Sequence, residues 1–205
     1  LYYRFIAPHL AGQADKMLIW FPIAPNAKRF EDGKRPLSER NGEILLNGHI
    51  WRGQLGFHPY NFRTWAYARD GVTAKTHSIG DKTVPCGLEY PSFLAQYSGS
   101  MALCDIGIIP KYSEIPLAGC VTFAQYHKDY ENKGFKDGES GVYVTKANYD
   151  RLVGEFNKDP VYCVRKTLKG FQKSALVYLL RNWLKFYTVT LPGSTILPVG
   201  DLLKK

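Results

Sequence analysis

The 205-residue chain has no uninterrupted run of the roughly 18 apolar residues that a membrane-spanning helix needs. The nearest candidate, residues 174–191, carries Arg181, Asn182 and Lys185 in its middle. We therefore expect an amphipathic helix in this part of the chain and no transmembrane helix.

The sequence also lacks the common catalytic and cofactor motifs. It contains no nucleophile elbow, phosphate-binding glycine loop, dinucleotide fingerprint or zinc-protease motif. The five histidines are scattered, and no pair has the i, i+3 or i, i+4 spacing that brings two imidazoles to one metal from a helix. We predict no catalytic residue, no cofactor and no metal site. An enzyme of an unrecognised family stays open, and a deep pocket with convergent polar groups would be its sign.

Closely spaced cysteines are absent as well. Cys86, Cys104, Cys120 and Cys163 are 18, 16 and 43 residues apart, which excludes CxxC pairs and the short spacings of zinc sites. Each stands in an apolar context, so we predict buried, reduced thiols, with two disulfides in a secreted protein as the alternative. The same context predicts that Cys120 is inert and forms no thiol–base pair with His127.

The sequence does carry an excess of positive charge, and this excess is uneven. The formal net charge is +9, and residues 146–205 hold eleven basic and four acidic residues. Such a segment suits phosphates, anionic lipid headgroups or an acidic partner, and a merely solvated helix face is the alternative. The residues that we expect to face an anionic surface are Arg165, Lys166, Lys169, Lys173, Arg181 and Lys185.

Aromatic residues are concentrated in residues 49–71, which hold six aromatic rings, two histidines and three arginines. Trp, Tyr, Phe and Arg are enriched where protein surfaces are permanently buried, so the favoured interpretation is a protein–protein interface. Core of an irregular fold, a nucleic-acid platform and a small-molecule site are the alternatives. With two residues of the N-terminal segment, the interface candidates are Trp20, Phe21, Trp51, Phe57, Tyr60, Phe62, Trp65 and Tyr67.

Local patterns predict a mixed α+β single domain. Residues 1–40, rich in proline and aromatics, should form an extended arm, residues 41–145 a body with short hairpins and loops, and residues 146–205 a basic helical region that joins the body. Asn47-Gly48 predicts a hairpin turn, residues 92–104 a helix, and residues 119–126 and 141–145 strands. Thr145 should cap an amphipathic helix, and Asp159-Pro160 should begin a second one.

These features together predict a non-catalytic accessory subunit of a large assembly, most plausibly a respiratory-chain or ATP-synthase complex of the mitochondrial inner membrane. The first residue, Leu1, suggests a removed presequence, and reduced thiols fit the matrix side. Its partners would be other protein subunits, with anionic lipid headgroups and RNA as further possibilities. A mitochondrial ribosomal protein that contacts RNA is the first alternative, and an enzyme is the second.

Overall fold

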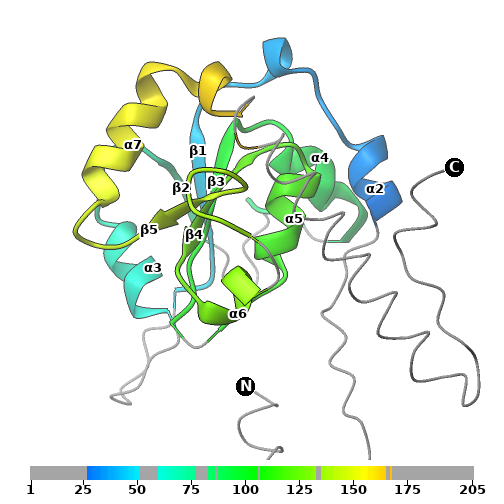
Figure 1. Ribbon diagram of the computed structural model, residues 1–205. Helices are drawn as coiled ribbons and strands as arrows, with labels where there is room; N and C mark the ends of the chain where they lie inside the picture. Colours follow the sequence, from blue (N-terminus) through cyan, green and yellow to red (C-terminus); the bar gives the residue numbers. More distant parts are fainter. Residues whose placement is uncertain are drawn as a thin grey trace, which may run out of the picture.

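The computed structural model describes residues 27–50, 60–76, 83–85, 87–105, 107–132, 135–164 and 167 (Figure 1). Several residues singled out above lie outside these ranges, so their predicted roles stay predictions. They are the interface candidates Trp20, Phe21, Trp51 and Phe57 and the basic residues Arg165, Lys166, Lys169, Lys173, Arg181 and Lys185.

The centre of the domain is a parallel sheet of five strands. These are β1 (Ile44–Gly48), β2 (Thr73–Thr76), β3 (Gly99–Ala102), β4 (Val121–Gln125) and β5 (Val142–Val144). Their spatial order is β2-β1-β3-β4-β5, and all four pairings are parallel. The register places Leu45 beside both Thr73 and Ser100, and Phe123 beside both Met101 and Val142. This order belongs to the doubly wound α/β sheets.

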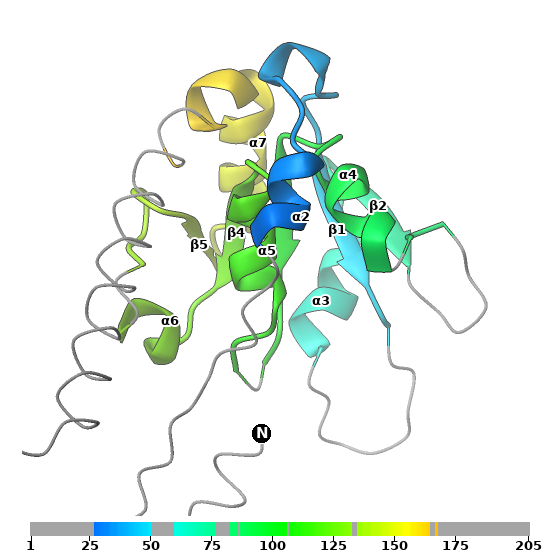
Figure 2. The ribbon, with the colours of Figure 1, turned by 90° about the vertical axis from the view of Figure 1, so that its right-hand side faces the viewer.

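Helices cover both faces of the sheet, as parallel strands require. They are α2 (Ala27–Asp32), α3 (Asn61–Ala66), α4 (Tyr90–Leu94), α5 (Lys111–Leu117), α6 (Lys128–Asn132) and α7 (Tyr149–Lys158), with short 3-10 turns η2 (Leu37–Glu39) and η3 (Gly87–Glu89). In Figures 1 and 2, α2, α4 and α5 lie on one side of the sheet and α3 and α7 on the other. The prediction of one domain that mixes helices and strands is therefore confirmed.

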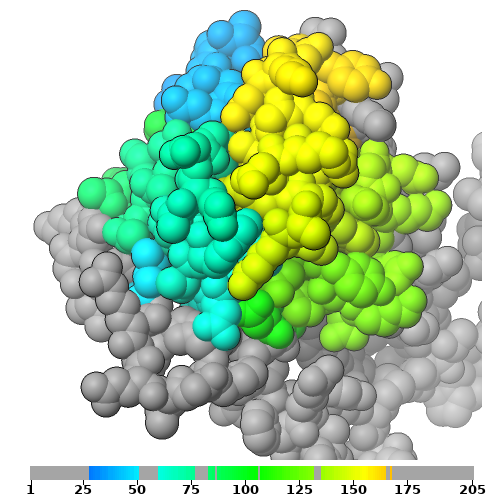
Figure 3. Space-filling model, turned by 90° about the vertical axis from the view of Figure 1, so that its left-hand side faces the viewer, coloured from blue at the N-terminus to red at the C-terminus, as the bar shows by residue number. Residues whose placement is uncertain are grey.

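Each face of the sheet has its own hydrophobic core. On the face of α4 and α5, Leu45, Ala102 and Ala124 of the strands meet helix and loop side chains, among them Phe30, Leu94, Tyr97, Tyr112, Ile115, Tyr130 and Phe135. On the opposite face the strands contribute Ile44, Leu46, Met101 and Phe123, and the helices contribute Phe62, Ala66, Tyr149, Val153 and Phe156. Figure 3 shows α7 beside the segment of α3 and β2 over this second face.

The helix predicted after Thr145 is confirmed as α7. Its buried residues Tyr149, Val153 and Phe156 follow the predicted spacing. Before it, the Thr145 amide donates to Asn148 Oδ1 at 2.7 Å, and the Asn148 amide donates to Thr145 Oγ1 at 3.3 Å. The predicted cap is nevertheless wrong: Asn148 is the N-cap of α7 and no side chain caps the helix by a hydrogen bond, so the Thr145–Asn148 pair closes the turn that precedes α7.

The second predicted helix also starts where expected. Asp159 Oδ1 accepts a hydrogen bond from the Tyr162 amide at 2.9 Å, and residues 160–164 are helical. Part of the predicted arm, in contrast, is helical rather than extended, because residues 27–32 form α2 and Phe30 is buried in the core. The strands predicted near 119–126 and 141–145 are β4 and β5.

Two predictions of local structure are wrong. Asn47-Gly48 does not turn the chain into a hairpin, because both residues belong to β1, and every strand pairing in the described part is parallel. Residues 92–104 do not form one helix, because α4 ends at Leu94 and Gly99–Ala102 form β3. In both places tertiary burial of a short apolar run outweighs the local signal, since a central parallel strand is apolar on both faces.

No helix among the described residues is both long and apolar enough to span a bilayer. The three cysteines that the structure describes, Cys104, Cys120 and Cys163, form no disulfide. Burial raises the pKa of the Cys120 thiol to about 12, and its sulfur donates to the carbonyls of Leu94 and Tyr97 at 3.3 and 3.2 Å. A thiol held in this way is inert, as predicted.

Replacing Leu45 tests the two-sided burial of β1. Leu45 is fully buried, so Leu45→Ala should lower the free energy of unfolding by about 2–5 kcal/mol through lost apolar contact and a residual cavity. Urea denaturation followed by circular dichroism measures this change. Leu88→Ala is the matched control, because 79 % of Leu88 is exposed, and it should change the value by less than about 0.5 kcal/mol. Equal losses for the two variants would contradict the strand assignment.

Candidate functional site

The connections of β1 and β3 diverge at the carboxyl edge of the sheet, the lower edge in Figure 2. From β1 the chain passes to β2 through α3, on the face of α7. From β3 it passes to β4 through α5, on the opposite face. In a doubly wound sheet this divergence leaves a crevice beyond the strand ends, and ligands bind there.

A pocket of about 530 Å³ occupies this position. The end of β1, the loops after β1 and β3, and the helices α2, α3, α4 and α5 contribute to its walls. The volume lies within the range of about 300–1,000 Å³ that is usual for small-molecule sites. Its polar lining residues are Arg29, Asn47, His49, Tyr60, Arg63, Tyr90, Lys111 and Glu114.

Gly48 lets two basic side chains meet at the end of β1. It has a φ of +132°, and a Cβ there would lie 2.7 Å from Arg63 Nη1 and 3.2 Å from Lys111 Nζ. Only a residue without a side chain leaves room for both groups, and glycine also accepts this backbone conformation at little cost. The Asn47-Gly48 pair that suggested a turn therefore serves close packing at the site.

Arg63 is a buried cation that binds backbone oxygens. It is only 4 % exposed, and its guanidinium donates to the Leu103 carbonyl at 2.6 Å and to the His49 carbonyl at 3.3 Å. The group also lies 4.0 Å from the centre of the Tyr60 ring, as a cation–π pair. Burial lowers the pKa of Arg63, yet an arginine stays protonated at neutral pH. Within the described ranges Arg63 forms no ion pair.

Lys111 begins α5 on the other side of the crevice. Its Nζ donates to Asn47 Oδ1 at 2.6 Å and to the Asn47 carbonyl oxygen. Burial, reinforced by the charge of Arg63 and opposed by Glu114, lowers the pKa of Lys111 well below its usual range. Glu114 lies one helical turn further on, and burial raises its pKa against the pull of Lys111 and Arg29.

Among the described residues, two polar atoms on the pocket wall are buried without a hydrogen-bond partner. Arg29 Nε is one, although the same guanidinium donates through Nη2 to the Gly87 carbonyl. The Tyr90 hydroxyl is the other: burial raises the pKa of Tyr90 and the nearby Asn47 side chain opposes this, but the hydroxyl forms no hydrogen bond of normal geometry with a described residue. A buried polar group without a partner costs roughly 1–3 kcal/mol, so such atoms on a pocket wall indicate a place for ligand atoms.

A second cluster of polar residues at the same edge connects the ends of β3 and β4 with each other and with α3. Asp105 accepts hydrogen bonds from the Phe62 amide at the start of α3, at 3.3 Å, and from Gln125 Nε2 at 2.8 Å. His127 Nε2 lies 2.6 Å from the Cys104 carbonyl, to which it donates. These contacts join the ends of β3 and β4 to α3. No group of three or more metal-ligating side chains occurs in the described part of the chain.

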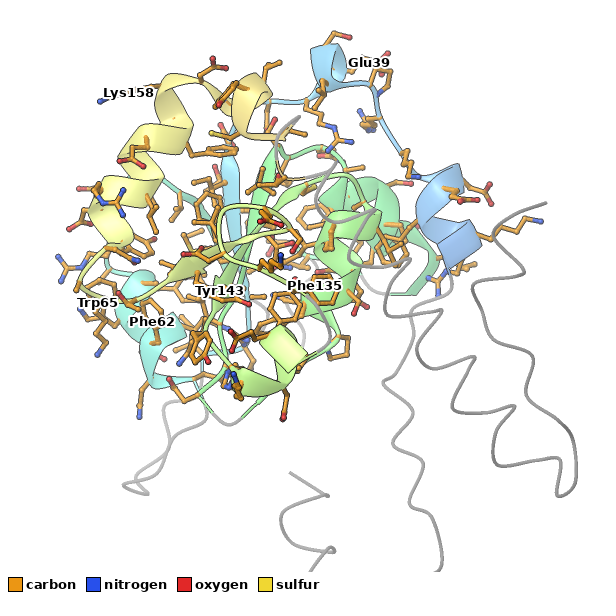
Figure 4. All side chains as sticks on the ribbon, in the orientation of Figure 1. Glu39, Phe62, Trp65, Phe135, Tyr143 and Lys158 are labelled. Atoms are coloured by element: carbon orange, nitrogen blue, oxygen red, sulfur yellow. The ribbon has the colours of Figure 1, made fainter. Side chains whose placement is uncertain are left out.

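The structure places four predicted interface residues in or beside α3, and Figure 4 labels two of them, Phe62 and Trp65. Phe62 is buried in the core, and Trp65 is half-buried against Tyr149 with Arg69 4.3 Å from its ring centre. The Tyr67 hydroxyl lies 3.0 Å from the carbonyl oxygens of Gly48 and Lys75, and burial raises its pKa to about 12. Tyr60 lines the pocket.

Sequence reasoning missed the polar residues that define the pocket. Arg29, Lys111 and Glu114 stand in unrelated stretches of the chain and match no motif. The one local signal is the run that ends at Pro110, where an apolar segment stops and Lys111 opens a helix with Glu114 in its first turn. That signal marks a strand-to-helix connection but carries no information about which strand lies beside it.

Comparison with known proteins adds no assignment: no protein-family model, no curated protein and no solved structure matches this chain. The function must therefore be inferred from the pocket.

Placing a side chain at position 48 tests the close approach of the two basic side chains. Gly48→Ala would put a Cβ into contact with Arg63, so we expect a loss of stability larger than the roughly 1–2 kcal/mol of a left-handed alanine alone. Gly138→Ala is the matched control, since Gly138 has a φ of +71° but no atom within 4 Å of an added Cβ. Thermal unfolding of both variants gives the comparison, and equal destabilisation would contradict the described packing.

Proposed function

We propose that this domain binds a phosphorylated small molecule of roughly mononucleotide size in the pocket at the carboxyl edge of β1 and β3. The observation that carries the proposal is an imbalance of charge: the guanidinium groups of Arg29 and Arg63 line the pocket, against one carboxylate, Glu114. Neither guanidinium forms an ion pair in the described part of the chain. A buried cation without a counter-ion is costly, and an anionic ligand supplies the missing charge.

The chemistry of the lining favours phosphate attached to a polar organic group. Guanidinium groups bind phosphate oxygens through two parallel hydrogen bonds, and the free Arg29 Nε can take part in such a pair. Glu114 can accept a hydrogen bond from a ligand hydroxyl, and the unpartnered Tyr90 hydroxyl can donate one. Phe30, Tyr60 and Ile109 provide apolar and aromatic wall for a ring or a carbon chain.

Calorimetric titration of the full chain tests the proposal. Inorganic phosphate, nucleoside 5′-monophosphates and nucleoside diphosphates should bind, and the matching unphosphorylated nucleoside should bind at least about tenfold more weakly. Arg29→Gln should weaken every phosphorylated ligand by about tenfold or more, because a hydrogen bond to a charged group contributes roughly 1.5–3 kcal/mol. Arg151→Gln is the control: Arg151 is exposed on α7 and pairs with Glu155, so its loss should leave binding unchanged.

The Glu114 carboxylate should distinguish the two parts of the ligand. Glu114→Gln keeps the shape of the side chain but weakens its acceptance of ligand hydroxyls, so nucleotides with both ribose hydroxyls should lose affinity. Inorganic phosphate, which has no such hydroxyl, should bind at least as well as before, because a nearby negative charge is removed. Unchanged affinity for every ligand in both Arg29→Gln and Glu114→Gln would contradict the proposed site.

The accessory-subunit function remains a separate proposal, supported by composition, the basic C-terminal region and the exposed apolar side chains Leu88, Val161 and Tyr162. Fractionation of the native source tests it. A subunit of a respiratory-chain or ATP-synthase complex at the mitochondrial inner membrane should co-migrate with a high-mass complex that resists ribonuclease. A ribosomal protein should be released by ribonuclease, and a freely soluble monomer would contradict both.

A further inference from the structure

Among the described residues, the Lys111 amine has two hydrogen-bond acceptors, the number that a neutral amine needs. Both of its hydrogen bonds go to a single residue, the side-chain and main-chain oxygens of Asn47. Asn47 is itself fixed, since it is 2 % exposed and stands in β1 between β2 and β3. A neutral amine has two N–H donors and one lone pair, so two acceptors satisfy its hydrogens and leave the lone pair unengaged. An ammonium group would have a third N–H, for which no described residue supplies an acceptor.

We propose that Lys111 is a nucleophilic amine that condenses with the carbonyl group of a phosphorylated aldehyde bound in this pocket. Lys111 lines the same cavity as Arg29 and Arg63. An aldehyde whose phosphate binds the two guanidinium groups therefore has its carbonyl group in the cavity that Lys111 Nζ also lines. The proposal therefore rests on the proposed function for its phosphate anchor, although the reactivity of the amine can be measured without it.

The reaction needs no component besides the aldehyde. The Nζ lone pair attacks the carbonyl carbon, and the carbonyl π electrons move to oxygen. One N–H proton passes to that oxygen to give a carbinolamine, and loss of the hydroxyl with a second proton releases one molecule of water. The product is an imine between Nζ and the former carbonyl carbon, and no oxidation or reduction occurs.

The surroundings of the amine keep it reactive at neutral pH. Desolvation and the charge of Arg63 disfavour the ammonium form, and Glu114 opposes them, so the net effect is a lowered pKa. At neutral pH an exposed lysine is almost entirely protonated, whereas a lowered pKa leaves a larger fraction of the amine neutral and nucleophilic. Selectivity for Lys111 should therefore be greatest near neutrality and should fade as rising pH deprotonates the other lysines. The ionisable groups around the pocket are Arg29 on α2, Arg63 on α3, Tyr90 on α4, Glu114 on α5, and His49 and Tyr60 after β1.

Reductive trapping of the full chain tests the proposal. The protein is incubated at neutral pH with pyridoxal 5′-phosphate, reduced with borohydride, digested and analysed by peptide mass spectrometry. We expect Lys111 to be modified at least tenfold faster than Lys158, which points away from the sheet at the end of α7 (Figure 4). Excess inorganic phosphate should slow the labelling of Lys111 and leave that of Lys158 unchanged. Labelling of Lys111 no faster than that of Lys158 overturns the proposal, whatever the affinity for phosphate.

Two variants and a second probe separate this proposal from the proposed function. Lys111→Arg keeps a long hydrogen-bond donor beside Asn47 but cannot form the imine, so the fast adduct should disappear while thermal unfolding stays cooperative. Pyridoxal, which lacks the phosphate, should label Lys111 at least tenfold more slowly, and Arg29→Gln should reduce the rate with pyridoxal 5′-phosphate to a similar level. If pyridoxal labels Lys111 as fast as its phosphate ester does, the amine is nucleophilic as proposed and the phosphate anchor is wrong.

Discussion

The whole arrangement depends on β1 and β3, whose residues are buried from both faces of the sheet. Residues 44–47 and 99–102 are all buried, so helices must cover the sheet on both sides. The small residues of β3 make this possible. A Cβ at Gly99 would lie 3.1 Å from the rings of Phe123 and Phe156 and 3.3 Å from Ile44. Close packing of these rings over a glycine lets α7 approach the sheet.

Two-sided burial also creates the crevice and its chemistry. Several backbone carbonyls lie at or just beyond the strand ends in this crevice, and buried carbonyls need hydrogen-bond donors. Side chains from the surrounding helices supply them. Arg63 binds the His49 and Leu103 carbonyls, Lys111 binds the Asn47 carbonyl, and the Tyr112 hydroxyl binds the Gln125 carbonyl. The need to satisfy these oxygens thus brings basic side chains into a partly buried pocket, where charge acts over a low dielectric.

Many of the aromatic side chains that the structure describes pack inside the domain. Tyr112 meets Tyr130 edge to face at 4.8 Å, and Tyr130 stacks on Phe135 at 4.2 Å. Tyr143, which lies beside Phe135 in Figure 4, donates its hydroxyl hydrogen to the Phe135 carbonyl at 2.8 Å. The connection from β4 to β5 contains only one short helix, α6. The aromatic rings of this connection bury the apolar area that longer helices bury in the other connections.

The sequence by itself determined the mixed class of the domain, β4, β5, α7 and the helix start at Asp159, because each is encoded by neighbouring residues. Apolar spacing defines α7, and side-chain capping by Asp159 defines the start of the next helix. Only the tertiary structure decided that Asn47-Gly48 ends a central strand, and that Arg29, Arg63, Lys111 and Glu114 surround one pocket. Strand order is the physical reason, because parallel pairing places β1 between β2 and β3. Residues more than 60 positions apart, such as Asn47 and Lys111, thereby become neighbours. Local propensity does not encode such long-range contacts.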